Sequence, residues 1–132
     1  MPISRKVFVF GNSDLDFDSL PLRILPKLKK RLPEIDFEIK DPNEEWEIFE
    51  NELIIIDTVV GIDKPVVFDS LENFSASPRV SMHDFDAYAN LKYLQKLGKI
   101  KKIKIIGLPP DASENEAVGF IKAIIKPDDN RV

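Results

Sequence analysis

The chain has 132 residues, 43% of them hydrophobic and 32% charged, a balance typical of one globular domain and not of a disordered chain. The net charge of −4 argues against nucleic acid as the main partner, since the basic clusters Lys27–Arg31 and Lys99–Lys104 are typical of solvated helix and strand ends. The absence of Cys excludes disulfides, thiol nucleophiles and cysteine metal sites, and it fits a reducing compartment. Met1–Lys6 shows no signal peptide and no apolar run is long enough to span a membrane, so we expect a cytoplasmic protein without membrane contact.

Apolar segments predict the strands. Four successive apolar residues in Val7–Phe10 indicate a strand buried on both faces, whereas Asp36–Lys40 alternates apolar and charged residues like an edge strand. Leu53–Ile56 is the most hydrophobic run and predicts the central strand, closed by an aspartate. Val66–Phe68 follows after fewer residues than the dozen that a parallel crossover needs, so we expect it to run antiparallel. Ile103–Gly107 is the last predicted strand.

Helix signals alternate with these strands. Leu20–Leu32 carries apolar residues at the 3.6-residue period, and Pro26 within it predicts a late start or a kink. The acidic segment Glu44–Glu52 predicts a short helix over the sheet. Capping boxes at Ser81–Asp84 and Ser113–Glu116 open two more helices. Gly98 ends the first of these helices, Pro127 ends the second, and the second has apolar positions at Ala117, Phe120, Ile121 and Ile124.

Together these elements predict an α/β fold in one domain covering residues 1–132. We expect a three-layer, doubly wound sheet of about five strands, mostly parallel with one antiparallel strand over residues 66–71, and helices on both faces. Ligands of such sheets bind outside the carboxyl ends of the strands.

The loop after the first strand carries acids at alternate positions. Asp14, Asp16 and Asp18 imitate the first ligands of a calcium loop, but Ser19 and Leu25 stand where that loop needs glycine and a bidentate acid. The EF-hand interpretation therefore fails.

The central strand ends in Asp57-Thr58-Val59. An acid in this place is typical of haloacid-dehalogenase phosphatases and of response-regulator receivers; Val59 excludes the phosphatase, which needs a second acid there, and the antiparallel strand argues against the all-parallel receiver. There is no Walker loop, G-x-S-x-G elbow or H-E-x-x-H helix, and one His without Cys argues against a nucleophilic triad.

Asp18, Asp57 and His83 remain as a possible constellation at the rim of the sheet. Two carboxylates and an imidazole suit a divalent transition metal such as nickel, zinc or iron, and the helix N-terminus would keep His83 neutral. The same residues are equally explained as two strand-end turn residues and a helix-start residue.

The order of these motifs resembles the nickel-dependent [NiFe] hydrogenase maturation endopeptidases. That family has an apolar strand, a Gly-Asn pair, an acid six residues after the Asn and an Arg in the following helix. It then has an apolar strand ending in Asp with a small-apolar pair behind it, and a Ser-x-His at a helix start. The matching residues are Gly11, Asn12, Asp18, Arg23, Asp57, Val59, Val60, Ser81 and His83.

The resemblance implies that Asp18, Asp57 and His83 contact nickel, and that Asp41 lies near the scissile bond as a catalytic residue of an aspartic-type endopeptidase. The implied activity removes the C-terminal peptide of a [NiFe] hydrogenase large-subunit precursor after nickel insertion. Nickel belongs to the substrate, held by its cysteines, and no organic cofactor is implied. Pro21 and Pro42-Asn43 stand where the family has glycines. An alternative is therefore a non-catalytic metal- or partner-binding α/β module, receiver-like or metallochaperone-like.

Overall fold

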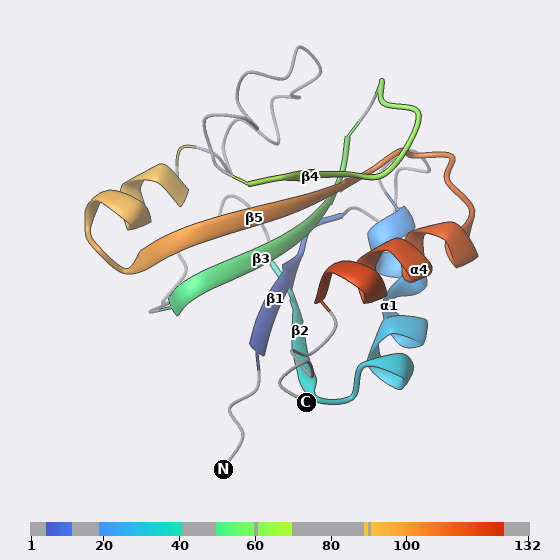
Figure 1. The fold of residues 1–132 in the computed structure, drawn as a ribbon, viewed down its shortest axis with the longest axis horizontal. Coiled ribbons are helices and arrows are strands. Elements are labelled where there is room, and N and C mark those ends of the chain that lie inside the picture. The colour runs from blue at the N-terminus through green and yellow to red at the C-terminus, as the bar shows by residue number, and fades with distance from the viewer. Residues whose placement is uncertain are drawn as a thin grey trace.

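The computed structural model describes residues 5–11, 19–40, 50–59, 61–69, 89 and 91–125. It contains a five-stranded sheet in the order β2-β1-β3-β5-β4 (Figure 1). The strands are β1 Arg5–Val9, β2 Ile35–Ile39, β3 Glu50–Thr58, β4 Val66–Phe68 and β5 Ile100–Leu108. All neighbours are parallel except β4, which is antiparallel to β5. The predicted α/β class with one antiparallel strand is therefore confirmed, and β3 is the central strand.

Strand β4 runs antiparallel to β3, as predicted. The strand that it pairs with is β5, although the short connection after β3 suggests β3 itself. Strand β4 lies on the far side of β5, where Val66 is opposite Gly107 and Phe68 is opposite Ile105. A short connection suffices because the chain crosses only the end of β5. The strand ends at Phe68, earlier than the predicted residue 71, and residues 70 and 71 lie outside the described part of the chain.

One face of the sheet is covered by helices α1 (Leu20–Arg31) and α4 (Glu114–Ile125) (Figure 1). Pro21 occupies the first turn of α1, where its missing amide costs nothing. The helix begins at Leu20 and continues through Pro26, so the late start is wrong, while the alternative, a kink at Pro26, stays a prediction. The face of α4 is rotated slightly from the predicted one, since Val118 and Ile125 are buried while Phe120 and Ile124 are only partly so. The core on this side joins both helices to the inner residues of the sheet, among them Val7, Val9, Ile24, Leu28, Ile54, Ile56, Ile106 and Ile121.

The opposite face of the sheet is covered by a helix over residues 91–96. Leu91 and Leu94 pack into a second core with side chains of three strands, which include Phe8, Phe10, Leu53, Ile55, Ile103 and Ile105. Gly98 ends this helix with φ +77°, as predicted. Its amide donates to the Gln95 carbonyl, and the Lys99 amide donates to the Leu94 carbonyl, the two bonds of a Schellman cap. Helices thus lie on both faces of the sheet.

One further sequence-based expectation about local structure was wrong. Glu50 to Glu52 belong to β3, because pairing with the start of β5 extends the strand beyond its apolar run, so the predicted helix over residues 44–52 does not reach this far. Residues 41–49 lie outside the described part. Ile39 continues the inward alternation of Ile35 and Phe37, yet it is 58% exposed at the end of the edge strand. Of the helices described, none has the length and apolar character needed to cross a membrane.

Candidate functional site at the carboxyl ends of the strands

Asp57 is the one predicted site residue that the structure places. It lies near the carboxyl end of β3 and is only 2% exposed to solvent. The Thr58 amide donates a hydrogen bond to Asp57 Oδ1 at 2.8 Å, which orients the carboxylate. A buried carboxylate is costly unless it is hydrogen-bonded or paired, so a polar residue at this position of the most apolar strand calls for a specific role.

The surroundings of Asp57 on the sheet are apolar and closely packed. Side chains alternate along β3, so Asp57 shares its face with Ile55 and Val59, on the side of the 91–96 helix. Its partner on β5 is Gly107. A Cβ at Gly107 would lie 2.8 Å from Val59 Cγ2 and 3.1 Å from Phe68 Cε2, so Val59 and Phe68 occupy the space that a side chain would fill.

Four parallel strands end at the level of Asp57, since β5 ends at Leu108, the partner of Thr58. Val9 of β1 is opposite both Ile39 of β2 and Ile56 of β3. The Phe10 amide donates to the Ile56 carbonyl at 2.9 Å, and the Lys40 amide donates to the Val9 carbonyl at 3.0 Å. The rim on which the sequence predicts a site is therefore formed by β1, β2, β3 and β5 together.

Asp18, Asp41 and His83 lie outside the described residues. The predicted grouping of Asp18, Asp57 and His83 therefore remains a prediction, as does the role of Asp41. Within the described ranges, no group of three or more His, Cys, Asp or Glu side chains is placed to hold a metal ion.

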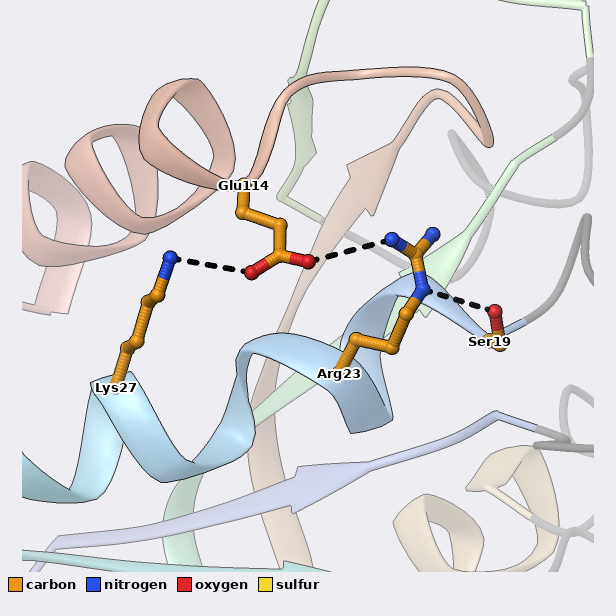
Figure 2. Close-up of polar contacts among 4 residues, drawn as sticks. All are labelled: Ser19, Arg23, Lys27 and Glu114. Atoms are coloured by element: carbon orange, nitrogen blue, oxygen red, sulfur yellow. Dashed lines mark hydrogen bonds and ion pairs between the residues drawn. The ribbon is translucent and has the colours of Figure 1, made fainter.

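The start of α1, directly after Asp18 in the sequence, is tied to α4 by a polar network (Figure 2). Ser19 is the N-cap residue and is buried, but its hydroxyl makes no capping bond to a backbone amide. Arg23 Nε instead donates to Ser19 Oγ at 3.0 Å. Arg23 Nη1 and Lys27 Nζ lie 3.4 and 3.1 Å from the two carboxylate oxygens of Glu114. One glutamate in the first turn of α4 thus binds two cations of α1.

Thr58 places a hydroxyl on the other face of β3. The residue is 5% exposed, and its Oγ1 atom is buried without a hydrogen-bond partner among the described residues. An unsatisfied buried hydroxyl costs about 1–3 kcal/mol, so this end of β3 is not optimised for stability alone.

The carboxylates of β2 form a separate cluster on the strand itself. Burial raises the pKa of Asp36, and the hydrogen bond and negative charge of Glu38 raise it further against the opposing charges of Lys6 and Lys29. Burial also disfavours ionised Glu38, but the Asp36 hydrogen bond and the Lys6 and Lys40 ammonium groups outweigh it and lower its pKa. Lys6 Nζ and Lys40 Nζ lie 3.4 and 3.5 Å from the Glu38 carboxylate oxygens. Lys6 and Lys40 thus already pair with Glu38, so contacts between neighbouring strands explain this cluster.

Sequence reasoning missed Gly107, Ser19 and Glu114 as residues that build this rim. Gly107 had a signal, because a glycine within an apolar strand often marks a close approach of neighbouring groups. Ser19 and Glu114 had no such signal. Their contacts with Arg23 depend on side-chain geometry, and Arg23 lies 91 positions from Glu114 in the sequence.

No protein-family model and no curated protein matches this sequence. Solved structures do match in fold. The hydrogenase maturating endopeptidase HybD from E. coli aligns with a TM-score of 0.68 at 18% identity, over 95% of this chain and 94% of that one. An endopeptidase from Escherichia coli aligns with a TM-score of 0.64 at 16% identity, over 94% of each chain. The hydrogenase 3 maturation protease aligns with a TM-score of 0.57 at 14% identity, over 91% of this chain and 88% of that one.

These alignments cover nearly the whole of each chain. They therefore define the fold class of this chain, which has the α/β architecture of solved hydrogenase maturation endopeptidases. The resemblance found in the sequence motifs thus extends to the tertiary structure.

Proposed function

We propose that this protein is an endopeptidase that removes the C-terminal peptide of a [NiFe] hydrogenase large-subunit precursor once nickel has been inserted. The observation that carries the proposal is Asp57, a buried, oriented carboxylate at the carboxyl end of the central strand. It stands in a chain whose fold is that of solved hydrogenase maturation endopeptidases. The lack of Cys fits action in a reducing compartment such as the cytoplasm.

Nickel enters this proposal as part of the substrate, bound by the precursor. Asp18, Asp57 and His83 are the residues that would contact it, and two carboxylates with one imidazole are a donor set that suits nickel. Asp41 would lie near the scissile bond. The enzyme would in this way distinguish a loaded precursor from an empty one.

The described residues support this role of Asp57 in two ways. The Thr58 amide orients Oδ1 of the carboxylate. Low exposure and the apolar neighbours Val59 and Phe68 reduce screening by water, so the attraction between this carboxylate and a cation is stronger than at an exposed site. The proline at position 21, where the family has glycine, is accommodated in the first turn of α1.

The test is cleavage of a nickel-loaded large-subunit precursor, followed by the mass of the large subunit. We expect Asp57→Asn to slow cleavage at least about 100-fold, because a lost metal contact costs no less than a lost supporting residue. The Asn side-chain oxygen can still accept the Thr58 hydrogen bond, so the change removes the charge and keeps the local geometry. Asp18→Asn and His83→Ala should reduce cleavage similarly, and Asp41→Asn should do so with nickel contact retained.

The matched control is Asp63→Asn, the same chemical change at an exposed residue. It should cleave at the wild-type rate. Equal cleavage rates for Asp57→Asn and wild type would contradict the assignment of Asp57 to the site. Equal cleavage of nickel-free and nickel-loaded precursor would contradict recognition of nickel. Nickel binding by the isolated protein without processing of any precursor would favour the non-catalytic binding module.

A further inference from the structure

A hollow of about 460 Å³ lies at the amino end of β5, the end opposite to Asp57. It is formed where the 91–96 helix turns through its glycine cap into the strand (Figure 1). The lining residues are Lys92, Gln95, Lys96, Gly98, Ile100 and Lys101.

The residues that line the hollow include three lysines and no acid, and the acids Glu50 and Glu52 lie on the neighbouring strand as the partners of Ile100 and Lys102. Residues 91–104 contain six of the 19 Lys and Arg residues of the chain and none of its 23 Asp and Glu residues. The other 13 cations and all 23 acids lie elsewhere in the sequence, so this segment is basic although the chain as a whole is acidic. Attraction to a single-signed patch of this kind steers and orients an oppositely charged partner.

Two of the three lysines that line the hollow, Lys96 and Lys101, are available to such a partner. Lys96 and Lys101 are exposed and, unlike Lys6, Lys27 and Lys40, have no ion pair in the described part of the chain. Gln95 Nε2 donates to the Lys101 carbonyl at 3.3 Å, which ties the helix to the strand across the hollow. Gly98 adds no side chain to the lining.

We propose that this hollow docks a short acidic segment of a partner protein, with at least two carboxylates binding Lys96 and Lys101. A long polyanion such as nucleic acid would extend beyond the hollow and be repelled by the rest of the chain, in which acids outnumber cations. A membrane is disfavoured because Tyr93 and Leu97, the exposed apolar residues of this region at 61% and 51%, do not line the hollow with the lysines. A hollow of this size fits a few residues of extended peptide.

Docking here leaves the candidate site accessible. Ile100 lines the hollow and Gly107 lies beside Asp57, at opposite ends of the same strand. At the rise of a β-strand the two are about 23 Å apart. The docking surface therefore does not depend on the proposed peptidase activity.

The experiment measures binding of fluorescein-labelled hexaglutamate to the full chain by fluorescence anisotropy at low salt. We expect the double variant Lys96→Glu/Lys101→Glu to weaken binding at least tenfold, and added salt to weaken wild-type binding steeply. Both lysines are exposed, so the variant should fold as the wild type does, which circular dichroism checks. The matched control is Lys30→Glu/Lys122→Glu, the same charge change at exposed residues of α1 and α4, which should lose less than twofold.

Three outcomes would overturn the proposal. The first is no binding by the wild type, and the second is equal weakening by the two double variants, which would indicate only an effect of net charge. The third is tighter binding of hexathymidylate or of anionic phospholipid vesicles than of hexaglutamate, which would identify another class of ligand.

Discussion

Gly107 is the residue whose small size shapes the candidate site. It is the strand partner of Asp57, and Val59 and Phe68 fill the volume beside its backbone. The requirement is one of space, since its φ is not positive. A glycine here lets two apolar side chains pack against the end of the central strand next to a buried carboxylate.

We expect Gly107→Ala to lower the free energy of unfolding by about 1–3 kcal/mol, because Val59 Cγ2 and Phe68 Cε2 must move for the new methyl group. Chemical denaturation measures the change. Gly119→Ala is the control, since no atom lies within 4 Å of a Cβ there and alanine favours the helix by about 0.5–1 kcal/mol. A stabilised Gly107→Ala variant would show that the packing is looser than described.

Helices α1 and α4 are joined at the element scale by one carboxylate. Glu114 takes up Arg23 and Lys27, and Arg23 also holds Ser19 (Figure 2). Ser113 caps α4 as predicted, accepting a hydrogen bond from the Glu116 amide at 3.0 Å. The starts of both helices are thus fixed relative to each other at the rim of the sheet, and α1 begins two residues after Asp18 in the sequence.

We expect Glu114→Gln to lower the free energy of unfolding by up to about 1 kcal/mol at low salt and by less at high salt, because the ion pairs are half-exposed. Denaturation at two ionic strengths checks this. Glu116→Gln is the control, since Glu116 lies in the same first turn of α4 and has no ion pair among the described residues. An equal loss in both variants would assign the effect to the helix dipole and not to the joint between the helices.

The whole molecule has two hydrophobic cores that share one sheet. Residues of β3 alternate between them, so Ile54 faces α1 and α4 while Ile55 faces the 91–96 helix. Because β3 and β5 contribute side chains to both cores and are held together by one backbone ladder, we expect neither core to be lost while the other keeps its strands.

We expect Ile54→Ala and Ile55→Ala each to lower the free energy of unfolding by about 2–5 kcal/mol, since both side chains are about 1% exposed. Each variant should still unfold in a single transition, with circular dichroism and hydrogen exchange of both faces changing together. An intermediate in which only one face exchanges would show that the two layers unfold separately, and would contradict the single domain predicted over residues 1–132.

Much of this architecture was predictable because it depends on local periodicity. Four apolar residues in a row at Val7–Phe10 do specify a buried parallel strand, and Gly98 does end a helix. Predictions were less accurate where pairing decides the outcome, as at Glu50 to Glu52, which become strand because β5 lies beside them. Ile39 has the apolar character of an inner residue and still lies exposed, since nothing in local periodicity tells how far the covering helix reaches.

The sequence by itself determined the fold class, the central strand and the position of Asp57 at its carboxyl end, because hydrophobic patterning and connection lengths constrain them. Only the tertiary structure decided that β4 pairs with β5, that Gly107 leaves room beside Asp57, and that Glu114 binds two cations of α1. It also placed Lys96 and Lys101, which lie on a helix and on the following strand, in the lining of one hollow. These features depend on distances between residues far apart in the chain, which packing fixes and periodicity does not contain.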